Sequence, residues 1–226
     1  SNYGQAKEKV DEDGELFPTS LYAETKVNLE KYLIKNIPNA TTLRCATAYG
    51  LSVGRMRFDL LVSDFIKEAW LEKQINVFMP EVHRPIVHVS DISNAILLCI
   101  DHEGTLSRVY NVGSSIQNYT KRQIAEKVAN RLNVPLNIVE KIDKRDYIVN
   151  FDKIKNELNF STKFLAEDGF EEMVKILEDG NFDLEQSNVW DMKFIPQFIP
   201  YWDESEKKAV ANVLEKDYLN DYKTVS

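Results

Sequence analysis

A tyrosine and a lysine four positions apart, in the segment Tyr22-Ala-Glu-Thr-Lys26, are the residues whose types and spacing point most directly to chemistry. Residues four apart share one face of an α-helix, so a helix here would place the phenol beside the ammonium. A neighbouring cation favours phenolate over phenol, which is what a tyrosine needs to act as a general base. Alone the pattern is weak, because any helix can carry a surface Tyr–Lys pair.

Few other residues are of a type and spacing that indicate catalysis, phosphate binding or metal binding. The eight glycines never form the pattern G-x-G, whereas the dinucleotide fingerprint and the Walker A loop both need closely spaced glycines. Two cysteines are too few for a disulfide framework or a structural zinc site, and we interpret Cys45 as a small buried side chain. His88 alternates with apolar neighbours and is interpreted as a core or loop-facing histidine with its hydrogen bonds satisfied. His83 and His102 have no partner at metal-ligand spacing, so no metal site is expected.

Composition narrows the class of protein. The chain has 226 residues, of which 43% are hydrophobic, and 28 basic against 36 acidic residues give a net charge of −8. An acidic surface argues against nucleic acid or an anionic membrane as the main partner. No apolar run approaches the roughly 18 residues of a membrane span, and the first residues lack the pattern of a signal peptide. We therefore expect a cytoplasmic protein without a nucleic-acid or membrane partner.

The elements that must position the Tyr–Lys pair alternate between helix and strand, which is typical of an α/β fold. The pair falls in a helix that should start after Pro18, with Thr19 or Ser20 as its cap, and end near Asn36. Ser90-Asp91 is expected to cap a later helix. Further helices are predicted at 58–73, 90–100, 120–132, 151–158 and 167–178, and strands at 40–47, 75–79, 86–89, 109–112 and 136–139.

The sequence changes character after about residue 180. An aromatic stretch punctuated by prolines cannot form a regular helix, so residues 181–203 are predicted to be a linker or docking arm. Residues 204–226 are predicted to form a helical tail. This end of the chain resembles the start of sugar aminotransferases that use pyridoxal phosphate, so the tail is either the start of a second domain or an ordinary extension.

An ordered series of motifs over residues 1–180 resembles the extended short-chain dehydrogenase/reductases, in particular the NAD-dependent nucleotide-sugar epimerase/dehydratase family. These motifs are, in order, Tyr3-Gly4, Tyr22-Ala-Glu-Thr-Lys26, Leu43-Arg44 with Tyr49-Gly50, Arg84-Pro-Ile-Val-His88-Val-Ser-Asp91, Tyr110-Asn-Val-Gly113, and Arg145-Asp-Tyr147 with Phe151-Asp-Lys-Ile154. The resemblance implies the C-terminal portion of a Rossmann-like, doubly wound parallel sheet, together with a small α/β substrate-binding subdomain.

The resemblance also implies a reaction and its catalytic residues. Tyr22 would be the catalytic base and acid, and Lys26 would contact the nicotinamide ribose of NAD or NADP. Thr47, where many relatives have asparagine, would line both the nicotinamide and the sugar. The implied substrate is a nucleotide-diphosphate sugar, and the implied assembly is a homodimer.

Substrate contacts carry over in the same way. Arg84 matches the arginine that grips the diphosphate, since a guanidinium fork suits phosphate oxygens. Its alternative is a solvated arginine at the end of a strand. The segment Arg57-Phe58-Asp59-Leu60 matches the stretch that lines the diphosphate. Arg145 is a second candidate for this contact, and an ion pair with Asp146 is an equal alternative.

The family's catalytic serine or threonine and its glycine-rich cofactor turn would precede Ser1. We therefore expect this chain by itself to be inactive and not to bind NAD tightly. Relatives that eliminate water carry a glutamate at the position that Ser1 occupies, and serine cannot replace its acid–base role. Epimerisation or ketone reduction is thus favoured over 4,6-dehydration. The alternatives left open are such a dehydratase and a non-catalytic nucleotide-sugar-binding or scaffold protein on the same fold.

Overall fold

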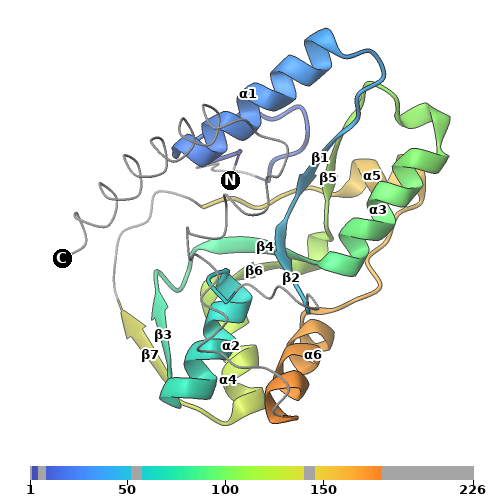
Figure 1. Cartoon of the computed structure of the whole chain (residues 1–226). Coiled ribbons are helices and arrows are strands. Elements are labelled where there is room, and N and C mark those ends of the chain that lie inside the picture. Colours follow the sequence, from blue (N-terminus) through green and yellow to red (C-terminus); the bar gives the residue numbers. More distant parts are fainter. Residues whose placement is uncertain (1, 5–8, 52–57, 140–145, 180–226) are drawn as a thin grey trace, which may run out of the picture. The chain divides into compact units, whose positions relative to one another are not determined.

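Helices and strands alternate through the computed structural model (Figure 1), so the predicted α/β class is confirmed. The structure describes residues 2–4, 9–51, 58–139 and 146–179, which all belong to one unit of the chain. Its α-helices are α1 (Leu21–Asn36), α2 (Leu61–Glu72), α3 (Val89–Asp101), α4 (Lys121–Leu132), α5 (Asp152–Leu158) and α6 (Ala166–Glu178). Its strands are β1 (Thr42–Cys45), β2 (Thr47–Tyr49), β3 (Ile75–Phe78), β4 (His83–His88), β5 (Val109–Val112), β6 (Asn118–Thr120) and β7 (Leu136–Val139).

Strands β1 and β5 form the parallel pair that lies nearest to the Tyr–Lys helix. Their register places Leu43 opposite Tyr110 and Arg44 opposite Asn111. Helix α1 lies on one side of this pair and α3 on the other (Figure 1). Helices on both faces of parallel strands are the arrangement expected of a doubly wound sheet.

Two further groups of strands complete the unit. Strand β4 lies between β2, which it pairs in parallel, and β6, which it pairs antiparallel. Strands β3 and β7 form another parallel pair. A large core lies between these strands and helices α2, α4 and α6, and a smaller core joins β5 to α3 and α5. The fully buried members of the large core include Ile66, Ile75, Ile86, Ile124 and Met173.

The predicted strand 40–47 is in fact two strands with different partners. Ala46 still donates its N–H to the carbonyl of Val112 (2.9 Å), but from Thr47 onward the chain pairs with β4 instead of β5. The apolar run therefore does not stay in one sheet. Cys45 is exposed at the last position of β1, and its interpretation as a buried side chain is wrong because the strand ends there.

The expected cap of the helix after β4 is also wrong. Helix α3 begins at Val89, and its cap is His88, whose Nδ1 accepts the N–H of Ser90 (3.2 Å). Asp91 is fully buried instead. Its carboxylate accepts the backbone N–H groups of Lys163 (2.9 Å) and Phe164 (3.2 Å), which lie just before α6. Burial of a carboxylate requires such partners, and Asp91 therefore fastens α3 to the segment that leads into α6.

The predicted linker and helical tail, 181–203 and 204–226, lie outside the described residues. In the parts of the chain that the structure describes, no helix combines the length and the apolar character that crossing a membrane requires.

Candidate active site

Helix α1 carries the Tyr–Lys pair, and its start is fixed by a local signal. Ser20 is extended, and its Oγ accepts the N–H of Ala23 (3.2 Å), so the helix begins immediately before Tyr22. Of the two predicted caps, Thr19 and Ser20, the structure has Ser20. One face of the helix is buried through Ala23, Val27 and Glu30, which leaves the neighbouring faces free to present functional groups.

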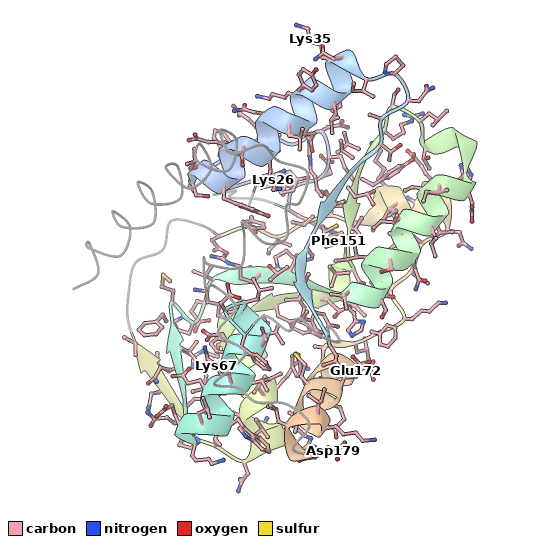
Figure 2. The ribbon with its side chains drawn as sticks, in the orientation of Figure 1. Lys26, Lys35, Lys67, Phe151, Glu172 and Asp179 are labelled. Atoms are coloured by element: carbon pink, nitrogen blue, oxygen red, sulfur yellow. The ribbon has the colours of Figure 1, made fainter. Side chains whose placement is uncertain are left out.

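Tyr22 and Lys26 lie side by side, as the spacing predicts. The Lys26 Nζ atom is 5.3 Å from the centroid of the Tyr22 ring. Tyr22 is 65% exposed and Lys26 is exposed as well, so a ligand can reach both groups. Figure 2 labels Lys26 near the start of α1, with Lys35 at its other end. A phenol with an ammonium against it is suited to exchanging a proton with a bound hydroxyl or carbonyl oxygen.

A buried polar network, which the sequence pattern did not reveal, lies behind this helix. Glu30 of α1 is 7% exposed, and Arg44 of β1 donates to it twice, from Nε to Oε2 (2.9 Å) and from Nη2 to Oε1 (2.6 Å). Arg44 Nη1 also donates to Tyr3 Oη (2.8 Å) and to the carbonyl of Glu12 (2.9 Å). Tyr3, Arg44 and Asn111 each belong to a motif quoted above, but their spacing in the sequence does not indicate that they meet one another or Glu30.

Ionisation in this network follows burial and pairing. Burial alone would lower the pKa of Arg44, but the hydrogen bonds to Glu30 and Tyr3 outweigh it and the pKa is raised. Burial raises the pKa of the Tyr3 phenol. It also raises the pKa of Glu12, whose carboxylate accepts the N–H of Asn111 at 2.6 Å. Arg44 is therefore charged, and burial makes Glu12 easier to protonate than an exposed glutamate.

Arg84 of β4 is 9% exposed, so it is not a solvated strand-end residue. Its Nη1 donates to the carbonyl of His83 (2.7 Å), and its guanidinium lies 5.7 Å from the centroid of the Tyr147 ring. The carboxylate of Asp146 accepts the backbone N–H of His83 (2.9 Å) and lies 3.0 Å from its Nδ1. Asp146 thus binds His83, and the adjacent Tyr147 lies against the adjacent Arg84. These contacts between two distant parts of the sequence hold the guanidinium in place.

Of the remaining predicted substrate residues, three lie at the start of α2 or in β2, and two lie outside the described residues. Asp59 is exposed and Leu60 is the cap of α2, where its carbonyl accepts the N–H of Asp64 (2.7 Å). Thr47 is half-buried in β2. Arg57 and Arg145 lie outside the described residues. Among the described residues, the predicted site residues fall into two groups: Tyr22 and Lys26 lie on α1, whereas Arg84, Thr47 and Leu60 belong to β4, β2 and the start of α2.

A cavity of about 420 Å³ lies along α2, starting one residue after Leu60. Its apolar walls include Leu61 and Phe78, and polar atoms come from Asn76 and Lys121. The full lining is Leu61, Asp64, Phe65, Lys67, Glu68, Leu71, Glu72, Asn76, Phe78 and Lys121. The lining therefore combines apolar side chains, two of them phenylalanines, with three carboxylates, two ammonium groups and one amide.

His88 is a structural residue, as predicted. It is 2% exposed, stacks on Phe164 with ring centroids 4.2 Å apart, and has its Nε2 3.0 Å from Oε2 of Glu172 on α6. Because Nδ1 accepts the N–H of Ser90, Nε2 carries the proton and donates to Glu172. Among the described residues, no three His, Cys, Asp or Glu side chains gather as a metal site would require.

The chain is similar to known proteins in sequence and in fold. Residues 1–113 match the profile of the NAD dependent epimerase/dehydratase family. Similar solved structures include MoeE5 in complex with UDP-glucose and NAD, which is 20% identical with a TM-score of 0.69; the match covers 80% of this chain and 63% of that one.

Two further similar structures come from bacilli. The dTDP-glucose 4,6-dehydratase from Bacillus anthracis in complex with NAD is 23% identical with a TM-score of 0.67, covering 80% of this chain and 60% of that one. The UDP-glucuronic acid 4-epimerase from Bacillus cereus in complex with UDP-glucuronic acid and NAD is 21% identical with a TM-score of 0.68, covering 79% and 59%.

The chain spans about three fifths of the length of each of these structures. At such identities the structural likeness shows a shared fold. The profile match covers half of the sequence, and this half includes both the Tyr22–Lys26 helix and Arg84. This chain belongs to the NAD dependent epimerase/dehydratase family.

Proposed function

We propose that the whole protein is an NAD-dependent nucleotide-sugar epimerase or ketoreductase. The observation that carries the proposal is the exposed Tyr22–Lys26 pair on α1, with the ammonium against the phenol ring, in a chain of this family. The similar structures contain NAD, and we take NAD rather than NADP as the cofactor for that reason.

Tyr22 is proposed to move the proton. As phenolate it accepts the proton of a sugar hydroxyl while the C–H electron pair of the same carbon leaves as hydride and a C=O bond forms. A bound nicotinamide supplies the hydride acceptor and later the hydride donor. In the return direction Tyr22 gives the proton back to the carbonyl oxygen. The ammonium of Lys26 stabilises the negative charge of the phenolate. It is also exposed, so it can donate a hydrogen bond to a cofactor hydroxyl.

Arg84 and the cavity along α2 are proposed to hold the nucleotide end of the substrate. A guanidinium fixed over Tyr147 can donate to phosphate oxygens without reorganising. Phe78 offers a ring face on which a base can stack, and Lys121 adds a positive charge at the edge of the cavity. These residues bind and orient; they take no part in the proton transfer.

Turnover by the whole protein tests this proposal. UDP-glucose, UDP-glucuronic acid and dTDP-glucose would each be incubated with NAD, while products are followed by NMR and reduced nicotinamide by absorbance. We expect conversion of one sugar with its nucleotide intact. A protein that binds nucleotide sugar and NAD but produces neither a new sugar nor reduced nicotinamide would instead be a binding or scaffold protein.

A further inference from the structure

In this chain, helix α1 contacts the remainder of the unit through a small apolar face. Only three of its side chains are buried: Ala23 at 1%, Val27 at 3% and Glu30 at 7% exposure. Two of these are small and apolar, and the third is a carboxylate. A buried carboxylate is costly unless it is paired, so the placement of α1 depends on what Glu30 meets.

Glu30 meets Arg44 in a two-point fork. Nε and Nη2 of the guanidinium each donate to a different oxygen of the carboxylate, at 2.9 and 2.6 Å. Both side chains are less than a tenth exposed. Two parallel hydrogen bonds between planar groups fix the distance and also the angle between them. The fork therefore specifies the rotation and the axial position of α1 over β1, which the small contacts of Ala23 and Val27 do not.

Arg44 is itself held from the other side. Its Nη1 donates to the Tyr3 hydroxyl and to the carbonyl of Glu12, and Tyr3 in turn donates to Oδ1 of Asn111 (2.6 Å). The carboxylate of Glu12 accepts the N–H of Asn111. The guanidinium is thus tied to β5 as well as to its own strand. A side chain fixed in this way transmits the position of the sheet to the helix.

Stability alone does not explain the fork. Buried ion pairs contribute little net stability, and replacement of both partners by apolar residues of similar size is often neutral or stabilising. What an apolar pair cannot reproduce is the directional lock. Precise placement matters to catalysis in general, because a misplacement of about 1 Å can lower a rate by about a hundredfold.

We propose that Arg44 is a positioning residue, which sets the rotation and axial position of α1 through Glu30 and so places Tyr22 and Lys26 for proton transfer. The kinetic part of this inference rests on the proposed function of Tyr22. The placement of α1 by Arg44 does not, and it can be measured on the chain itself.

The decisive variant is the double replacement Glu30→Leu/Arg44→Met, which removes both buried charges and keeps the volume. Arg44→Lys keeps the charge but loses the fork. The control is Arg131→Met/Glu171→Leu, a more exposed pair in which Arg131 of α4 makes the same Nε–Oε2 and Nη2–Oε1 fork to Glu171 of α6, away from the Tyr–Lys helix. All three would be compared with the wild-type protein in urea unfolding, amide hydrogen exchange and steady-state kinetics.

We expect the double variant to unfold near the wild-type urea midpoint while amide exchange in residues 21–30 becomes at least tenfold faster. In the whole protein its kcat should fall by about 10–100-fold with KM for the nucleotide sugar within twofold. Arg44→Lys should not restore kcat. The Arg131 control should change neither exchange in α1 nor kcat.

A double variant with wild-type exchange in α1 and wild-type kcat would overturn the inference, and so would rescue by Arg44→Lys. If the wild-type protein showed no turnover with any nucleotide sugar, the proposed function would fail, while the exchange measurement would still decide whether Arg44 places α1. If the double variant unfolds, exchange in Arg44→Lys, which keeps the buried charge balanced, takes its place: wild-type exchange there counts against the fork.

Discussion

The Nζ atom of Lys26 lies 5.3 Å from the centroid of the Tyr22 ring, one helical turn away along α1. Both side chains are exposed, whereas Ala23 and Val27, which follow Tyr22 and Lys26 in the sequence, are buried. The backbone of the pair is therefore anchored while its functional groups stay open to a ligand. This combination is what a proton-transferring site needs before substrate arrives.

Replacing Tyr22 by phenylalanine should abolish most of the turnover. The change removes only the hydroxyl that exchanges the proton, and general acid–base catalysis is worth about 10²–10⁴-fold. Affinity for NAD and nucleotide sugar should stay within about threefold, since shape and stacking surface are retained. Turnover by NMR and binding by calorimetry on the whole protein would measure the two effects separately.

Tyr32→Phe is the matched control, because Tyr32 is another exposed tyrosine of the same helix, at 58% exposure. It should leave turnover unchanged. Wild-type turnover in Tyr22→Phe would rule out the proposed role and favour a surface Tyr–Lys pair.

Lys26→Met should lower both turnover and cofactor affinity. In the proposed mechanism the ammonium stabilises the charge on Tyr22 and also donates to the cofactor, so one substitution would remove two interactions. We expect at least a tenfold loss in kcat and a tenfold rise in the Kd for NAD. Lys35→Met, at the other end of α1 (Figure 2), should affect neither quantity. Loss of kcat with an unchanged Kd for NAD would assign Lys26 to Tyr22 alone.

Signals that act within a few residues could be predicted from the sequence. Ser20 caps α1, and Thr120 caps α4 in a capping box with Gln123, because a side-chain oxygen three positions before a free N–H is a local relationship. The i,i+4 placement of Tyr22 and Lys26 is predictable for the same reason. The ordered motifs likewise gave the fold class.

Relationships across the sheet could not be predicted. The pair Ser90-Asp91 looks like an ordinary helix cap in the sequence. In the structure, Asp91 instead accepts hydrogen bonds from N–H groups 72 and 73 residues further on. Arg44 and Glu30 are 14 residues apart and meet only once α1 has packed on β1. The change of partner after Ala46 depends on where β4 lies, and nothing in the local apolar pattern encodes that position.

Arg84→Ala should weaken the binding of a nucleoside diphosphate to this chain. Loss of a charged hydrogen bond costs about 1.5–3 kcal/mol, which corresponds to about a 10–100-fold rise in Kd. UDP and dTDP titrated by calorimetry would measure it, with circular dichroism to verify the fold. Arg122→Ala is the control, since Arg122 is an exposed arginine paired with Glu81. Equal Kd values for wild type and Arg84→Ala would remove Arg84 from the site.

The stability of the chain should depend on pH through Glu12. Burial raises the pKa of this carboxyl, so the folded state holds the proton more tightly than the unfolded state, whose glutamate pKa is about 4.3. The stabilisation is fully present below that value and is lost as pH rises through the folded pKa. Glu12→Gln resembles the protonated form and should reduce the fall in urea midpoint as pH rises from acid to neutral. Glu15→Gln, at an exposed position in the same loop, should not.

The pKa of Glu167 is shifted in the opposite direction to that of Glu12. Its hydrogen bond from Lys127 lowers its pKa, so its contribution is present above the unfolded pKa and lost as pH falls through the folded pKa. Because this pair is largely exposed, the effect should be small.

A Glu12→Gln variant whose urea midpoint follows the wild-type pH dependence would contradict the assignment of that dependence to Glu12.

His88→Phe should destabilise the chain although the aromatic volume is kept. The substitution leaves the N–H of Ser90 without its acceptor and removes the link from β4 to Glu172 of α6. Loss of the acceptor for a partly buried donor costs up to about 1–3 kcal/mol, whereas the stacking on Phe164 would be preserved by a phenyl ring. His102→Phe, at an exposed site, should change the free energy of unfolding by no more than about 0.5 kcal/mol. Urea unfolding of both variants measures the difference, and equal midpoints would show that packing, and not the two hydrogen bonds, holds this histidine. Since β4 also carries Arg84, we further expect His88→Phe to weaken UDP binding less than Arg84→Ala does, because it removes no contact to the nucleotide.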